Sequence, residues 1–362
     1  MREVICAHAA RYPEMTAQDY MKLLYQSEFG PGHLVSAQDG KVLEWLEREL
    51  DQASAEGYAP AQPVEDIGGG LCRLHLDPRF LTRGDLPLLQ SCFALSVRPR
   101  GSREGLWHRV GQLAALCWEG EIPLKNEELS LYTALYDSQN CPAVSHSEGF
   151  RARYTPHYRV LETDLALFFP AFRAISAALS ATGGPVVVAV DGRCASGKTT
   201  FAARCAQVFS DCSVFHMDDF FLPFEKRTPE RLAQPGGNVD YERALDEVFA
   251  PLSRGEAVEL RAFDCSDGSF RPAVTHPFRR LNIVEGSYSH HPALAAYSQV
   301  KVFLTCSPET QLGRLAVRES PESLENFKTR WIPMEERYFA ALDVEAGSQV
   351  VVDTSGLKGE TR

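Results

Sequence analysis

The sequence predicts an α/β fold in which helices cover both faces of a parallel sheet, preceded by a mainly helical domain. Three observations support this prediction. Before about residue 180, apolar residues follow mainly helical spacing, whereas after the segment 181–185 short β-branched runs alternate with helical patterns. The first of these runs leads into a glycine-rich loop that opens a helix. Runs this apolar, separated by helices, are typical of a parallel sheet that is buried on both faces.

Composition places the chain among ordinary globular proteins. It has 362 residues, of which 44% are apolar and 23% charged, and this length is enough for two compact cores. The net charge of −11 argues against binding nucleic acid or an anionic membrane. No apolar run approaches the roughly 20 residues that span a membrane, and the N-terminus lacks the apolar core of a secretory signal. The ten scattered cysteines predict reduced thiols in the cytoplasm.

We expect residues 1–165 to form a mainly helical accessory domain of unknown role and residues 166–362 to form a second domain. Thr16 and Asp19 are typical of a helix start. Alternation of apolar and polar residues over 71–76 predicts a strand. The expected helices of this half cover 16–26, 42–50, 106–118 and 126–136, and a long apolar helix over 162–179 leads into the second domain.

The first half also contains scattered polar residues whose role the sequence leaves open. His33, His75 and His146 lack the tight spacing of a zinc site. A basic run, formed by Arg151, Arg153, His157 and Arg159, could bind an anionic ligand or pack against the acidic second half. The helical domain could equally build an interface between two copies of the chain.

The second half is expected to contribute strands over 186–190, 214–217, 258–263, 281–284, 300–305 and 349–352. Because ligands bind at the carboxyl ends of parallel strands, functional residues should follow these runs.

The strongest motif follows the first of these strands. Residues 192–199 match G-x-x-x-x-G-K-[ST] at every fixed position, the pattern of a P-loop NTPase. Glycines allow backbone N–H groups to turn towards phosphate oxygens, and the helix N-terminus favours negative charge. Lys198 can reach the β- and γ-phosphates, and the Thr199 hydroxyl can bind Mg²⁺. The predicted ATP-binding residues are Gly192, Ala195, Ser196, Gly197, Lys198, Thr199 and Thr200.

Carboxylates follow two further strands. Asp218 and Asp219 end one strand, and because side chains alternate, only one of them is expected to face the phosphate cleft. A carboxylate there could accept the proton of an acceptor hydroxyl, or it could merely cap a turn. Glu285 ends another strand and could hold Mg²⁺ through water or serve as a turn carboxylate. Asp191, just before the loop, is as suited to orienting backbone as to touching ligand.

Arginines are the remaining candidates for phosphate contacts. Arg314 and Arg318 are spaced i, i+4 and share a helix face. A guanidinium fork suits phosphate oxygens, although a solvated surface position is an equal alternative.

Residues 185–353 resemble the uridine kinase/phosphoribulokinase family of P-loop kinases, which includes a bacterial pantothenate kinase. The resemblance rests on the phosphate loop, on Met217-Asp218-Asp219-Phe220-Phe221-Leu222-Pro223, on Val284-Glu285-Gly286 and on the arginine-bearing helix. It implies that Asp218 is the catalytic base and that Arg314 and Arg318 lie beside a lid. It also implies that Asp240, Phe263 and Asp264 contact substrate. The segment Cys265-Ser266-Asp267-Gly268-Ser269 departs from the family, because uridine kinases carry a His and an Arg there.

The expected function is therefore an ATP-dependent and Mg²⁺-dependent kinase that phosphorylates a hydroxyl of a nucleoside, uridine-like, or of another small metabolite. An ATP-binding switch that signals through the first half with little chemistry is the alternative, and a kinase regulated by that half is a third reading. The expected partner is a small molecule, with neither nucleic acid nor membrane, and a homo-oligomer is conceivable.

Overall fold

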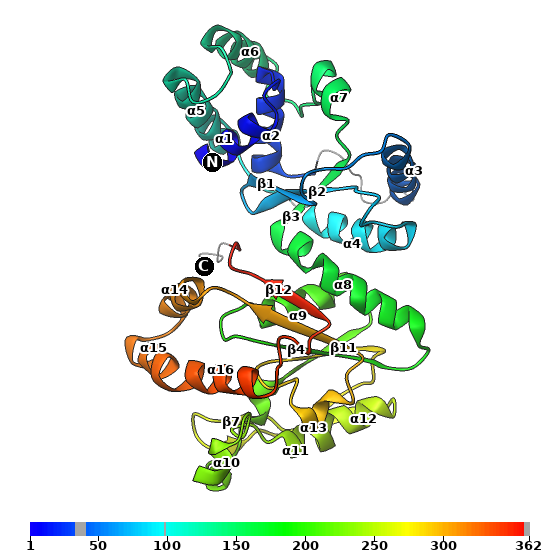
Figure 1. Ribbon diagram of the computed structural model, residues 1–362, viewed down its shortest axis with the longest axis vertical. Coiled ribbons are helices and arrows are strands. Elements are labelled where there is room, and N and C mark those ends of the chain that lie inside the picture. The colour runs from blue at the N-terminus through cyan, green and yellow to red at the C-terminus, as the bar shows by residue number, and fades with distance from the viewer. Residues whose placement is uncertain (33–40, 98, 358–362) are drawn as a thin grey trace. The chain divides into compact units, whose positions relative to one another are not determined.

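A computed structural model describes residues 1–32, 41–97 and 99–357. The chain divides into two compact units, Met1–Ala166 and Leu167–Arg362. Figure 1 shows the elements of both units along the chain.

The N-terminal unit combines helices with a small antiparallel sheet of order β1-β2-β3. Thr16 and Asp19 form the predicted capping box at the start of α2. Strands β1 and β3, which flank the predicted strand, were not expected from the sequence. The elements are α1 (Arg2–Arg11), α2 (Ala17–Phe29), α3 (Val42–Ala55), β1 (Val64–Gly68), β2 (Leu71–His75), η1 (Arg83–Asp85), α4 (Leu86–Ser96), α5 (Arg103–Glu119), α6 (Asn126–Ser138), α7 (Glu148–Tyr154) and β3 (Tyr158–Glu162).

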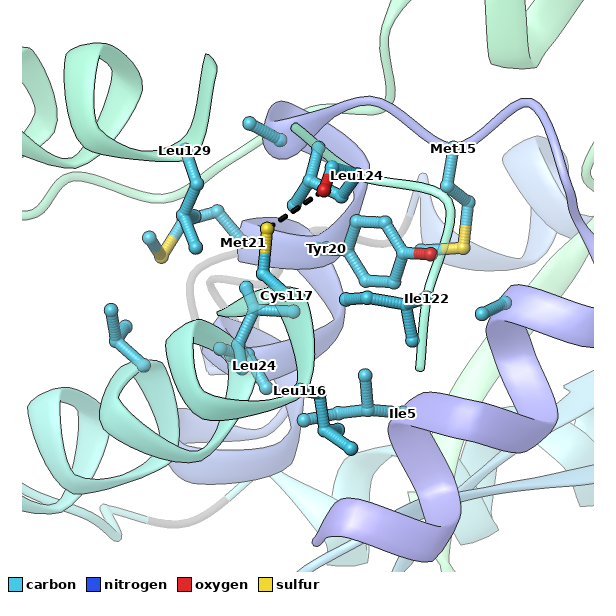
Figure 2. Packing of buried hydrophobic residues seen from close by; sticks show 14 of the residues in the cluster. Ile5, Met15, Tyr20, Met21, Leu24, Leu116, Cys117, Ile122, Leu124 and Leu129 are labelled. Atoms are coloured by element: carbon cyan, nitrogen blue, oxygen red, sulfur yellow. Dashed lines mark hydrogen bonds between the residues drawn. The ribbon is translucent and has the colours of Figure 1, made fainter. Parts of the chain in front are cut away.

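The apolar core of this unit lies between α1, α2, α5 and the loop that follows α5. Tyr20 and Met21 of α2 meet Ile5 of α1 and Leu116 of α5, all of them almost completely buried. Figure 2 shows these side chains converging, together with the hydrogen bond from the Cys117 thiol to the Leu124 carbonyl. The helical spacing of the apolar residues thus produces one shared core.

Buried polar residues line the side of the small sheet that faces α1 and α2. Arg73, only 1% exposed, donates to Gln26 and forms an ion pair with Glu65. His146 bonds to Asp19 at 3.1 Å and to the Tyr158 hydroxyl at 2.8 Å. Because buried polar groups need partners, these bonds define how the helices sit on the sheet.

The C-terminal unit contains a five-stranded sheet of order β12-β11-β4-β10-β5, and every neighbouring pair in it is parallel. The strands are β4 (Val186–Gly192), β5 (Cys212–His216), β10 (Leu281–Glu285), β11 (Val300–Thr305) and β12 (Val350–Asp353). All seven residues of β4 and all five of β10 are buried. The predicted α/β fold with a buried parallel sheet is confirmed.

Helices pack on both faces of this sheet (Figure 1). On one face, Phe172 of α8 stacks on Phe201 of α9, and Phe168 packs edge-to-face against the same ring. On the other face, Tyr338 and Phe339 of α16 join strand residues in a shared core. The remaining elements are α8 (Thr163–Ala181), α9 (Lys198–Val208), η2 (Met217–Phe220), η3 (Phe224–Lys226), α10 (Pro229–Ala233), α11 (Tyr241–Ala244), η4 (Leu245–Phe249), α12 (Ala250–Ser253), α13 (Pro292–Ala295), α14 (Pro308–Arg318), α15 (Pro321–Asn326), η5 (Phe327–Trp331) and α16 (Ile332–Ala341).

Two expectations need correction. The run 258–263 does not join the main sheet: β6 (Val258–Leu260) pairs with β9 (Val274–His276), and β7 (Phe263–Asp264) pairs with β8 (Ser269–Phe270). An apolar run reports burial but not which strand it pairs with. Helix α8 is, by length and composition alone, long and apolar enough to cross a membrane, with 19 residues and a mean hydropathy of 1.3, whereas no such run was expected. Its phenylalanines pack on α9, as in a core helix.

Candidate active site at the carboxyl ends of the strands

The phosphate loop connects β4 to α9 with the backbone conformation that its glycines predict. Gly192 has a φ of +137°, and a Cβ there would lie 2.0 Å from the Leu304 carbonyl oxygen, so no other residue fits. Gly197 (φ +94°) caps α9 without a side-chain hydrogen bond. The first N–H groups of α9 therefore have no intrahelical acceptor and are available to an anion.

Lys198 lies across the loop. Its ammonium donates to the carbonyls of Gly192 at 2.7 Å and Arg193 at 3.0 Å. Ala195 takes the left-handed conformation with φ +60°, and the Ser196 side chain is buried, with no partner for its hydroxyl in the part of the chain that the structure describes. A positive charge, free amides and this hydroxyl are thus gathered in one short loop. Thr200 follows as an exposed residue in the first turn of α9.

Asp191 holds the base of the loop. One carboxylate oxygen accepts from the Gly192 amide at 2.7 Å and the Tyr288 amide at 3.1 Å. The other accepts from the His290 amide and the Tyr338 hydroxyl, each at 2.9 Å. Of the two roles left open for Asp191, the structure supports the backbone-orienting one, because all four bonds tie protein groups together.

Glu285 meets the loop from β10. Its Oε1 accepts from the Thr199 hydroxyl at 3.1 Å and lies 2.7 Å from His216 Nδ1. The side chain of Glu285 is only 7% exposed. A hydroxyl and a carboxylate at this separation form the oxygen-rich donor set that Mg²⁺ prefers, so the residues present fit the predicted metal ligands Thr199 and Glu285.

Asp218 and Asp219 follow β5 in the short turn η2. Asp218 is open to solvent, yet the surrounding chain limits its hydration, which raises the pKa of its carboxyl, and the charge of Glu285 adds to this effect. Lys198 counteracts the rise at Asp218. The pKa of Asp219 is raised mainly by desolvation as well, but the cations acting on it are His216, Arg243 and His276. Of the two carboxyls, only Asp218 has Lys198 of the phosphate loop among the charges that shift its pKa, and the choice of Asp218 as the base stays a prediction.

The two predicted arginines differ in their surroundings. Arg314 donates to the carbonyls of Ala195, Thr354 and Leu357 and to the Thr354 hydroxyl, so it fastens the phosphate loop to the segment after β12. Arg318 is more than half exposed, and its charge acts on Asp218. The geometry favours a structural role for Arg314. Arg318 donates its Nε to Glu319 at 2.7 Å, and its two terminal nitrogens have no acceptor among the described residues.

The predicted substrate residues are mostly engaged within the protein. Asp240 is buried, caps α11 through the Arg243 amide and pairs with Lys226 at 3.0 Å. Phe263 is 4% exposed and packs against other aromatic rings. Asp264 accepts from Ser266 and pairs with Arg271, and the Ser266 hydrogen bond is the main reason that the pKa of Asp264 falls to about 2. Contact of these three side chains with substrate stays a prediction.

Sequence reasoning missed three residues of this site. Glu335 of α16 is buried and accepts from the Cys194 amide and the Ser287 hydroxyl. Burial raises the pKa of its carboxyl. Arg193 of the loop pairs with Glu336, and His216 contacts Glu285. No local pattern signals these contacts, because their partners are distant in sequence.

The basic run of the N-terminal unit is largely neutralised inside its own unit. Arg153 pairs with Glu14, and His157 and Arg159 both pair with Glu49. His75 is buried and bonded to Tyr58, whereas His33 lies outside the described residues. The described residues contain no group of three or more His, Cys, Asp or Glu side chains that could hold a metal ion.

The parallel sheet and the phosphate loop between β4 and α9 define an α/β fold of the P-loop type. A possible uridine kinase from Bacillus stearothermophilus is similar in structure, with 19% identity and a TM-score of 0.38 over 51% of this chain and 99% of that one. A D-glycerate 3-kinase from Cryptococcus neoformans matches at 14% identity and a TM-score of 0.38, covering 47% and 87% of the two chains. No protein-family model matches the sequence. At these identities the likeness concerns the fold alone.

Proposed function

We propose that the protein is an ATP-dependent phosphotransferase that acts on a hydroxyl of a small molecule. The observation that carries this proposal is the position of Asp218, a carboxylate without a protein hydrogen-bond donor in the described chain, within the electrostatic reach of the phosphate-loop lysine. A protein that only binds nucleotide needs no base there. A uridine-like nucleoside is one candidate acceptor, and the departures of the sequence after Asp264 leave other small metabolites open.

The residues of the chain divide the work of phosphoryl transfer. Amides of the phosphate loop and Lys198 bind the phosphates and offset the charge that develops on them. Asp218 accepts the proton of the acceptor hydroxyl and aligns its oxygen for in-line attack. Its raised pKa makes this carboxylate a stronger base than an ordinary aspartate. Arg318 is the candidate for stabilising negative charge from the lid side.

Thr199 and Glu285 would hold Mg²⁺ beside the phosphates. The ion would supply positive charge that offsets the charge of the phosphates during transfer. A pocket of about 480 Å³ adjoins the loop, with Arg193, Gln311 and Ser355 in its lining. It offers the rest of the nucleotide space at the carboxyl ends of β11 and β12.

A binding and turnover experiment tests the proposal. Wild-type protein should bind ATP more tightly with Mg²⁺, and Lys198→Ala should weaken binding at least tenfold without loss of fold, because Lys198 contributes charge rather than core packing. Lys226→Ala, on the acceptor side, is the matched control and should leave ATP affinity within about twofold. Equal affinity of wild type and Lys198→Ala in calorimetry would contradict the assignment.

An acceptor screen separates the kinase from the switch. ATP consumption is measured against nucleosides, pantothenate, hydroxy acids and small sugars. Stimulated turnover by one class supports the kinase and names its acceptor. Tight ATP binding with no stimulated turnover would favour the nucleotide switch that signals through the N-terminal unit.

The setting of the protein is part of the proposal. All ten cysteines are free thiols, which suits the reducing cytoplasm, where ATP is also available. We assign the N-terminal unit an accessory role, either regulation of the kinase or contact with a second copy of the chain.

A further inference from the structure

His216 ends β5 directly opposite Glu285. The two strands run parallel, and their register pairs His216 with Glu285. The His216 Nδ1 atom lies 2.7 Å from Glu285 Oε1. Because the contact is set by the register of two strands, it belongs to the rigid sheet rather than to a loop.

The bonds on Glu285 distinguish its two oxygens. Oε1 accepts from the Thr199 hydroxyl as well as from His216. A carboxylate oxygen has two lone pairs, so these donors occupy Oε1. Oε2 accepts no hydrogen bond from the described residues and is left for a metal ion or its water. Since a carboxylate only accepts, His216 must carry a proton on Nδ1 to make this bond.

We propose that His216 is a positioning residue that orients Glu285 towards the divalent cation bound with ATP. This inference rests on the proposed function. The Nδ1 atom of His216 donates to Oε1, so this atom acts on the carboxylate and does not itself bind the ion. Residues that orient a metal ligand commonly change metal affinity by about 10–100-fold when removed. A purely structural histidine would instead change the stability of the unit and leave the metal dependence alone.

The test compares a variant that keeps the hydrogen-bond donor with one that removes it. His216→Asn keeps an N–H donor close to the position of Nδ1, whereas His216→Leu removes it. His276→Leu is the control, because His276 lies in the same unit and packs on Phe215 of the same strand without a bond to Glu285. The full chain is used, and circular dichroism checks each fold. Because His216 is about half exposed, both variants should fold.

Two readouts decide the outcome. Calorimetry gives the ATP affinity without metal and the Mg²⁺ concentration that half-saturates the tightening of ATP binding, and Mn²⁺ binding in the presence of ATP is followed by electron paramagnetic resonance. We expect His216→Leu to raise the half-saturating Mg²⁺ concentration about tenfold or more and to leave metal-free ATP affinity within about twofold. His216→Asn and His276→Leu should stay within about threefold of wild type for Mg²⁺.

Unchanged Mg²⁺ dependence in His216→Leu would overturn the inference, as would His216→Asn behaving like His216→Leu. ATP binding by wild type that Mg²⁺ does not affect would also overturn it, while leaving nucleotide binding intact. Failure of the wild type to bind ATP at all would overturn the proposed function itself, so the two failures are distinguishable.

Discussion

Replacing Asp191 by asparagine should strongly destabilise the C-terminal unit. The carboxylate is fully buried and accepts four hydrogen bonds, two on each oxygen, from Gly192, Tyr288, His290 and Tyr338. An asparagine keeps one accepting oxygen, so its amide group faces two donors. A hydrogen bond to a charged group contributes about 1.5–3 kcal/mol. Losing two of them costs about 3–6 kcal/mol, a large share of the 5–15 kcal/mol typical of domain stability.

Hydrogen exchange measured by mass spectrometry is the suitable assay, because peptides of the N-terminal unit serve as an internal reference. Tyr338→Phe removes a single donor and should cost about half as much. Asp211→Asn is the control, since this aspartate is exposed and its substitution should leave the protection of the C-terminal unit close to that of the wild type. A loss of less than about 1 kcal/mol in the free energy of unfolding for Asp191→Asn, or an equal loss of protection in both units, would refute the conclusion that Asp191 holds the base of the loop.

Two further predictions concern turnover and acid stability. Asp218→Asn should lower kcat by about 10²–10⁴ at nearly unchanged ATP affinity, and Asp219→Asn should lower kcat less. Steady-state kinetics with the identified acceptor checks this, and a larger loss of kcat in Asp219→Asn than in Asp218→Asn would make Asp219 the base. The N-terminal unit should lose stability as pH falls from about 6.5 to 4. Burial is the main cause that lowers the pKa values of three of its histidines, His8 (to about 4), His75 (to about 4) and His146 (to about 3). In the unfolded chain these histidines bind protons at a higher pH than in the folded unit, so each lowers the free energy of unfolding by about 1.4 kcal/mol per pH unit over that window. Urea unfolding followed by tryptophan fluorescence in a Trp331→Phe background measures this free energy, and a value that does not change with pH contradicts the prediction.

The sequence predicted those features that depend on local patterns. The motif predicted the whole phosphate loop, because its glycines and Lys198 lie within one short segment of the chain. The buried strands of the main sheet were likewise visible as apolar runs. Strand β1 escaped detection because Glu65, which faces Arg73 across the strand pair, is charged yet buried. Prediction of strands from apolar and polar alternation assumes that charged residues are exposed, and this assumption fails for a buried ion pair.

The parts of the site that could not be predicted are contacts between distant segments. His216 and Glu285 are 69 residues apart in sequence, and Cys194 and Glu335 are 141 apart. Their meeting depends on strand register and on how α16 packs on the sheet. Neither follows from the types of residue alone.

The strand order has a consequence for biosynthesis. β4 carries the phosphate loop, yet its sheet neighbours β10 and β11 begin about 90 and 110 residues further along the chain. During translation the loop therefore emerges long before the strands that hold it, and Arg314 cannot fasten it until Thr354 has also left the ribosome. At elongation rates of about 5–20 residues per second, the nascent chain spends several seconds with β4 unpaired and its apolar residues uncovered. This interval is where we expect the chain to depend most on chaperones.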